Sequence, residues 1–192
     1  MKLHAKYVRL LAESSLKLLL VLSLVVLVQP FAVARRQTPV AQVNEMRKLD
    51  FLLGEWKGKG WRYVYRGGRS EYSQSVKVKN ESGGSVLRAR DARTYKDNGL
   101  LGSVPSSMMT IYYDEGAKLY RLSRDSVEGR KHPFELKLIE PETLQWEKQT
   151  PAGLIRTTIK ITEASEWHET LEVWNSVDGW YKAEESVLKR VK

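Results

Sequence analysis

The chain has 192 residues, of which 42% are hydrophobic and 29% are charged, and its formal net charge is +9. It contains no cysteine, which excludes disulfides, thiol catalysis and a lipid-anchoring cysteine. The positive balance raises nucleic acid as a partner, but there is no long block of like charges. We therefore interpret the charge as a solvated surface and expect no nucleic-acid partner.

Residues 1–34 have the layout of a secretory signal peptide. A basic start at Lys2 and Lys6 precedes an uninterrupted apolar run, Leu18–Val28, and small residues stand at 32–34. The apolar run is shorter than the roughly 20 residues that a membrane span needs. We expect cleavage after residue 34, export to the periplasm or the extracellular space, and no membrane insertion of the mature chain.

A tether and a short helix are predicted next. Residues 35–43 are polar, contain one proline and show no period, which is typical of a flexible tether. Asn44 is a suitable N-cap for a helix over 44–53, and Gly54 ends it. Met46, Leu49, Leu52 and Leu53 recur at helical spacing, so this helix has one apolar face that must cover another part of the protein.

Residues after Gly54 follow the period of β-strands. Turn signals from Gly67-Gly68 to Asp178-Gly179 separate about ten short segments, many of which alternate apolar and polar residues. An antiparallel sheet with one buried face is indicated, and closing it removes its sticky edges. We predict an all-β domain over 44–192, a closed up-and-down barrel of about ten strands. An eight-stranded lipocalin barrel and a β-sandwich are the alternatives. Residues 97–107 are expected to form a loop, either over the barrel mouth or packed on its neighbours.

The opening stretch LDFLLGEWKGKGW, residues 49–61, resembles the Gly-x-Trp entry of lipocalin-like (calycin-type) barrels. Gly58-x-Gly60 is similar to the nitrobindin-like, ten-stranded branch and to a bacterial domain family of unknown function. The resemblance continues in residues 110–122, Trp167-x-Glu169, Asp178-Gly179 and Leu188-x-Arg190. It implies that Trp56 plugs one end of the barrel and that Arg190 stacks across it, as a barrel-closing pair.

The nitrobindin likeness also implies a haem-binding histidine near the end of the barrel. Only His132 and His168 remain after signal removal, and the expected closing strand, 180–191, contains neither. His168 and Glu172 could share a strand face, but no third metal ligand joins them. We therefore expect no haem or other cofactor and no metal.

Charged residues are nevertheless expected inside the barrel. In residues 85–95, SVLRARDARTY, Arg88 and Arg90 share one face of the strand, while Asp91 and Arg93 share the other. Either orientation places a charge on the inner wall. Adjacent Glu184 and Glu185 must point to opposite faces. The inward one could orient a ligand, or could pair with an arginine such as Arg88 or Arg90.

Six tryptophans and nine tyrosines are more aromatic residues than a sheet requires, so some are expected to grip a ligand. The predicted ligand-binding residues are Trp61, Tyr63, Tyr112, Phe134, Leu136, Trp146, Ile159 and Trp180. We expect an exported monomer or homodimer that binds a small apolar or planar ligand without catalysis. One alternative is an isomerase or hydrolase that uses an inward glutamate among Glu169, Glu184 and Glu185. Another is an envelope-interaction module with a solid barrel.

Overall fold

A computed structural model describes residues 40–64, 68–97, 100–124, 133–151 and 153–191. The predicted signal peptide and residues 35–39 of the predicted tether lie outside these ranges. Helix α2 spans Val40–Arg47 and a 3₁₀ turn, η1, spans Asp50–Leu52. The helix thus begins earlier than predicted, with residues 40–43 in its first half and Asn44 in its interior. Its apolar anchors are nonetheless buried, as the spacing indicated.

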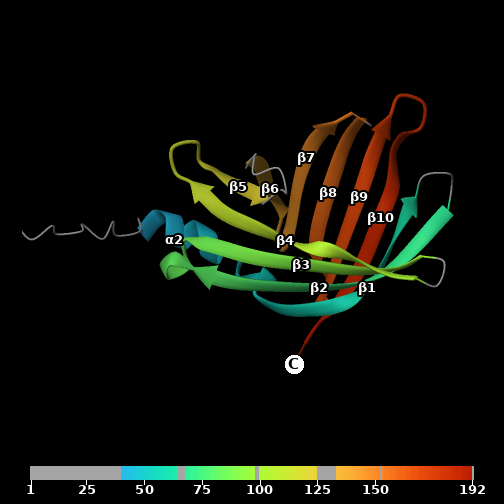
Figure 1. Cartoon of the computed structure of the whole chain (residues 1–192). Helices are drawn as coiled ribbons and strands as arrows, with labels where there is room; N and C mark the ends of the chain where they lie inside the picture. Colours follow the sequence, from blue (N-terminus) through green and yellow to red (C-terminus); the bar gives the residue numbers. More distant parts are fainter. Residues whose placement is uncertain (1–39, 65–67, 98–99, 125–132, 152, 192) are drawn as a thin grey trace, which may run out of the picture. The chain divides into compact units, whose positions relative to one another are not determined.

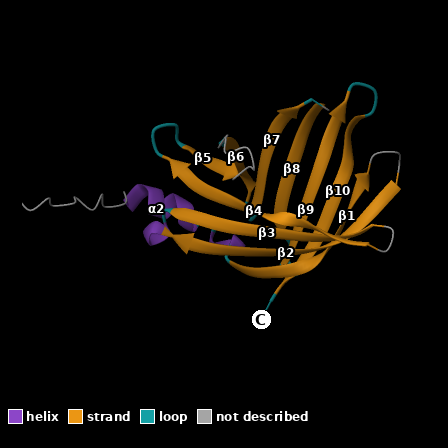
Figure 2. Ribbon diagram, in the orientation of Figure 1, coloured by secondary structure: helices purple, strands orange, loops and turns teal. Residues whose placement is uncertain are grey.

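Ten antiparallel strands form a closed barrel in which each strand pairs with its neighbour in sequence and β1 pairs with β10 (Figures 1 and 2). The predicted ten-stranded up-and-down barrel is therefore confirmed. The strands are β1 Gly54–Val64, β2 Gly68–Glu81, β3 Val86–Asp97, β4 Leu100–Asp114, β5 Leu119–Arg124, β6 Phe134–Glu140, β7 Thr143–Thr150, β8 Gly153–Ile161, β9 Glu166–Asn175 and β10 Gly179–Arg190.

Residues 100–107 were expected in a loop but belong to β4. This strand pairs with β3 over nearly its whole length, with one register irregularity opposite residues 91–93. Glycine, serine and proline in GSVPSS favour a loop, but the long neighbouring β3 supplies hydrogen-bond partners along the entire segment. The prediction of a loop over 97–107 was wrong because tertiary pairing overrides local propensity.

The barrel closes where its first and last strands meet. Trp56 is the register partner of Arg190, and the pairing continues to Arg62 and Glu184. The guanidinium carbon of Arg190 lies 4.1 Å from the ring centroid of Trp56, and Nη2 donates to the carbonyl of Phe51 at 3.1 Å. Trp56 itself donates from Nε1 to the carbonyl of Leu52 at 2.9 Å. The turn η1 is thereby fastened to the closing strands.

The apolar core occupies the end of the barrel where β1 begins and β10 finishes, which we call the helix end. Figure 1 shows α2 beside the turn between β2 and β3 at this end. We call the opposite end, at the β9–β10 turn, the far end. The most deeply buried large side chains at the helix end are Met46, Leu49, Leu52, Trp56, Val76, Leu87, Leu144 and Leu188. In the described ranges, no helix has the length and apolar character to cross a membrane.

Candidate functional site

The inner wall carries a cluster of ionised and polar side chains centred on Arg93. Its Nε lies 3.1 Å from Asp91 Oδ2 and its Nη2 lies 3.2 Å from Glu169 Oε1, while Nη1 contacts Glu184 Oε1. One guanidinium from β3 therefore joins carboxylates from β3, β9 and β10. All four side chains are 7–18% exposed, so solvent reaches them only slightly. We call Arg93, Asp91, Glu169 and Glu184, with Tyr72 and Gln74, the Arg93 cluster.

Two side chains of β2 complete the cluster. Tyr72 donates its hydroxyl to Glu184 Oε1 at 2.7 Å. Gln74 donates from Nε2 to Asp91 at 3.0 Å and to Glu169 at 3.3 Å. Both side chains are only 3% exposed. The carboxylates are thus positioned by donors from two directions, which fixes their orientation inside the barrel.

Two glycines of β1 make room for this cluster. A Cβ at Gly60 would lie 2.5 Å from the ring of Tyr72, and a Cβ at Gly58 would lie 2.0 Å from the backbone oxygen of Val187. Both distances are far below van der Waals contact. The glycine-rich opening of the barrel therefore has two causes: β10 approaches β1 closely, and the ring of Tyr72 fills the space above Gly60.

Burial and neighbouring charge set the ionisation of the cluster. Burial raises the pKa of Glu169, and the negative Asp91 and Glu184 add to this effect, although Arg93 opposes it. Burial alone would lower the pKa of Arg93, but the surrounding carboxylates outweigh it, so Arg93 stays charged. Burial also raises the pKa of Tyr72, which therefore keeps its proton and acts as a donor. Glu169 is thus the carboxyl of the cluster whose pKa is shifted above its ordinary value.

The strand register links this cluster to an aromatic residue on another part of the inner wall. The register connects Glu184 through Leu171 and Thr157 to Trp146 on β7. Trp146 is 9% exposed and belongs to the core cluster, against which Phe134 also packs. The barrel interior therefore combines charged and polar groups on β2, β3, β9 and β10 with aromatic groups on β6 and β7.

Of the predicted ligand-binding residues, those from β6, β7 and β8 face the interior. Leu136, Trp146 and Ile159 are buried in the core and Phe134 packs against it.

The other predicted ligand-binding residues lie on the outer face. Trp61 and Tyr63 alternate with the inward Trp56, Gly58 and Gly60, and Tyr63 is 55% exposed. The prediction that they line the interior was wrong, because we assigned the aromatic face of β1 to the inside. After Trp56, the inner positions of β1 are Gly58, Gly60 and Arg62.

Tyr112 and Trp180 are also on the outer face. Tyr112 alternates with the buried Ile111 on β4. Trp180 is the register partner of the half-exposed Trp174, and the guanidinium of Arg156 lies 3.8 Å from its ring centroid. The ring of Trp180 also packs against that of Trp174, and the predicted place of Tyr112 and Trp180 on the inner wall was wrong.

The charged residues follow the alternation read from the sequence. Asp91 and Arg93 point inward, and Glu184 points inward while Glu185 bonds Lys182 and Trp61 on the outside. The inward glutamate pairs with Arg93 and not with the expected Arg88 or Arg90. Sequence reasoning missed the roles of two β2 residues, Tyr72 and Gln74. Their alternation with exposed neighbours in SEYSQSVKV was the available signal.

His168 does not join the cluster. His168 lies next to the inward Glu169 and contacts Glu166, with 3.4 Å between Nε2 and Oε2. His132 lies outside the described ranges. Within those ranges, no group of three or more histidine or carboxylate side chains is arranged to hold a metal.

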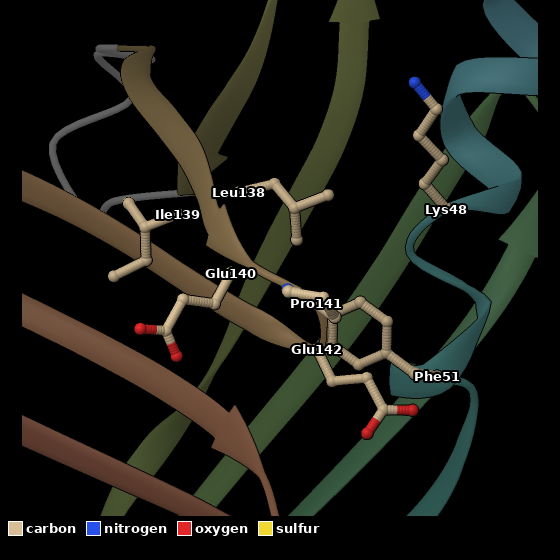
Figure 3. Close-up of a pocket in the computed structure, with 7 residues that line it drawn as sticks. All are labelled: Lys48, Phe51, Leu138, Ile139, Glu140, Pro141 and Glu142. Carbon is tan, nitrogen blue, oxygen red and sulfur yellow. The ribbon is translucent and has the colours of Figure 1, made fainter.

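A separate pocket of about 640 Å³ lies on the surface beside η1 (Figure 3). Phe51 and Lys48 line one side of it and the β6–β7 turn lines the other. Lys48 is engaged by Glu45 at 2.7 Å. No set of polar groups converges on this pocket, so the Arg93 cluster is the better candidate site.

Comparison with solved structures shows that other proteins share this barrel fold. The S-type phycobiliprotein lyase CPES from Guillardia theta is similar with a TM-score of 0.55 and 13% identity, over 79% of this chain and 93% of that chain. Rv2717c from M. tuberculosis is similar with a TM-score of 0.54 and 14% identity, over 77% and 97%. At these identities the likeness shows the fold alone. No family model and no curated protein matches the chain.

Proposed function

We propose that the chain is an exported, lipocalin-like carrier that binds a small apolar or planar ligand inside its barrel without catalysis. The binding site would lie between the Arg93 cluster and the aromatic wall formed by Phe134 and Trp146. The observation that carries this proposal is the contrast within one interior. The helix end is packed with apolar side chains, whereas inner positions further along β3, β9 and β10 carry charged groups that solvent still reaches. A phycobiliprotein lyase among proteins of this fold supports ligand handling by such a barrel.

The charge cluster itself favours a binding role over a stabilising one. Buried ion pairs are costly to desolvate, and replacing them by apolar side chains of similar volume is often neutral or stabilising. A barrel selected only for stability would continue its apolar packing up to the level of Arg93. A polar group of a ligand gives these side chains a function that packing does not explain.

A titration with a planar fluorescent dye tests the carrier function. We expect an apolar planar dye to bind the purified protein and to quench tryptophan emission. Trp146→Leu should weaken dye binding by about tenfold, because the removed ring belongs to the inner wall. Trp174→Leu is the matched control, since Trp174 is 45% exposed on the outer face. Equal losses in both variants, or a protein that binds no planar apolar dye, would contradict the proposal.

Export has its own test. We expect the protein isolated from its native host to begin at Arg35 and to be found outside the cytoplasm. Mass spectrometry of the intact protein measures the new N-terminus, and cell fractionation measures the location. A cytoplasmic protein with an intact N-terminus would contradict export and would leave ligand binding unaffected.

Catalysis is a second candidate, because one observation favours it. Glu169 is an inward carboxyl whose pKa is raised and which lies beside a guanidinium, and such groups are used as general acids or bases. An isomerase or hydrolase of this kind would convert a bound ligand, and Glu169→Gln would abolish conversion while keeping the ligand bound. Recovery of every bound compound unchanged from the wild type would favour the carrier.

A further inference from the structure

Unpaired buried polar atoms gather at one place on the barrel wall. In the described part of the chain, four buried side-chain atoms have no hydrogen-bond partner: Arg62 Nε, Gln74 Oε1, Trp167 Nε1 and Ser186 Oγ. Such atoms are rare in native proteins, and each needs an explanation. Their shared location requires a common explanation.

The strand register places all four beside the glycines of β1. Gln74 is a partner of Gly58, whose other partner, Leu188, pairs with Trp167. Ser186 is a partner of Gly60, and Arg62 is the next inward residue of β1. The four atoms therefore lie on three successive levels of one wall. This is the wall on which the Arg93 cluster is built.

The unpaired atoms include both donors and acceptors. Arg62 Nε and Trp167 Nε1 can only donate. Gln74 Oε1 can only accept, and its orientation is fixed because its amide nitrogen donates to Asp91 and Glu169. Ser186 Oγ can do either. An ion of one sign would satisfy only one of these two classes.

Arg62 is the member that would orient a ligand. In the part of the chain that the structure describes, it forms no ion pair, although Glu184 is its register partner. Its guanidinium instead lies 3.8 Å from the ring centroid of the buried Tyr95. The guanidinium plane is thus held by stacking, and Nε is left buried without a hydrogen-bond partner.

We propose that this wall recognises a planar cyclic amide, that is, a ring carrying both an N–H donor and a carbonyl acceptor. The inference rests on the proposed carrier function and specifies its ligand. The ring N–H donates to Gln74 Oε1, and the carbonyl oxygen accepts from Arg62 Nε or from Ser186. The planar body of the ring packs against the aromatic wall that contains Trp146. A neutral amide also suits a wall where the positive Arg93 is already paired with Asp91, Glu169 and Glu184.

A pair of matched probes tests the donor and acceptor pattern. The probes are 1,8-naphthalimide, which has an imide N–H between two carbonyls, and its N-methyl derivative, which lacks the N–H. We expect the wild type to bind naphthalimide at least about tenfold more tightly, because a buried acceptor is left unpaired by the methylated probe. Fluorescence titration measures both dissociation constants.

Two variants locate the recognition. Arg62→Met keeps the length of the side chain and should weaken naphthalimide binding by about tenfold. Arg69→Met is its matched control, because Arg69 stacks on Trp61 at the same 3.8 Å but on the outer face, and it should bind as the wild type does. Ser186→Ala removes an already unpaired hydroxyl, so it should keep the fold and weaken the binding of both probes, because both carry the carbonyl that Ser186 would contact.

The possible outcomes separate this inference from the carrier function. Equal binding of both probes, unchanged in Arg62→Met and Ser186→Ala, would mean that the unpaired atoms are satisfied by water only. That result would overturn the amide site and leave the carrier standing. Binding of neither probe would overturn the carrier as well. A preference of the wild type for naphthalimide, together with weaker binding in Arg62→Met or Ser186→Ala and unchanged binding in Arg69→Met, would support the site.

Discussion

The two ends of the barrel are built from the same ten strands by opposite chemical rules. At the helix end, Trp56, Leu144 and Leu188 are fully buried, and α2 and η1 cover the opening. Further along β3, β9 and β10 toward the far end, Arg93 holds carboxylates that remain slightly exposed. Burying apolar side chains stabilises a domain directly, whereas buried charges stabilise it only when their pairing offsets the free energy lost by removing them from water. We infer that the helix end supplies most of the stability, and that the inner wall around the Arg93 cluster is therefore available for binding.

The largest expected effect is at the helix end. Trp56→Ala removes a ring that is 0% exposed and packs at 5.6 Å, centroid to centroid, against Trp167. We expect the free energy of unfolding to fall by about 3–5 kcal/mol, because the cavity cannot collapse inside a closed barrel. Urea-induced unfolding measures the loss. Trp174→Ala on the outer face should cost much less, and an equal cost would refute the division between the two ends.

The second prediction sharpens the role of the glycines at the polar level. Gly60→Ala places a Cβ within 2.5 Å of the Tyr72 ring and 2.7 Å of a backbone oxygen, so the ring must move and its bond to Glu184 must weaken. We expect a loss of about 1–3 kcal/mol in unfolding free energy together with weaker probe binding. Gly116→Ala is the control, since its Cβ would meet its nearest atom at an ordinary 3.5 Å. Probe binding unchanged in Gly60→Ala would show that Tyr72 is not part of the site.

These glycines also show what the sequence could and could not reveal. The two-residue period and the regular turns predicted the closed ten-stranded barrel, and the alternation in β3 predicted charge on the inner wall. The inner face of β1 was misassigned, because an aromatic residue is normally the inward one of an alternating pair. The true reason for Gly60 is the ring of Tyr72 on the next strand. A large side chain on one strand that fills the space above a glycine on the next strand produces no pattern within either strand's own sequence. Only the assembled structure shows this arrangement.

The third prediction concerns how the stability of the protein depends on pH. The pKa of Glu169 in the folded state is raised above its ordinary value of 4.5, so folding favours its protonated form. The resulting stability is fully present below the unfolded pKa and is lost as the pH rises through the folded pKa. We therefore expect the unfolding free energy of the wild type to fall over this window, and Glu169→Gln to lack that part of the fall.

Urea unfolding at a series of pH values from 4 upward measures this difference. The control is Glu172→Gln, which changes an outer-face residue of the same strand that lies 3.9 Å from Arg156. It should follow the pH dependence of the wild type. Parallel curves for the wild type and Glu169→Gln would show that the carboxyl titrates as it does in the unfolded chain, and the electrostatic contrast between the two ends would be lost.

The smallest effect is expected from the polar side chain that closes the helix end. Arg190 stacks on Trp56 and donates to the carbonyls of Leu53 and Phe51, but it is exposed to solvent. An exposed cation–π contact contributes about 0.5–1 kcal/mol, so Arg190→Lys should lower the unfolding free energy by about 1 kcal/mol once the planar hydrogen bonds are lost. Lys189→Ala, next to it and more exposed, should change it by less. If Arg190→Lys cost as much as Trp56→Ala, the helix end would be held by its charged rim. Burial of apolar side chains could then no longer explain why the helix end is stable enough to support the polar Arg93 cluster.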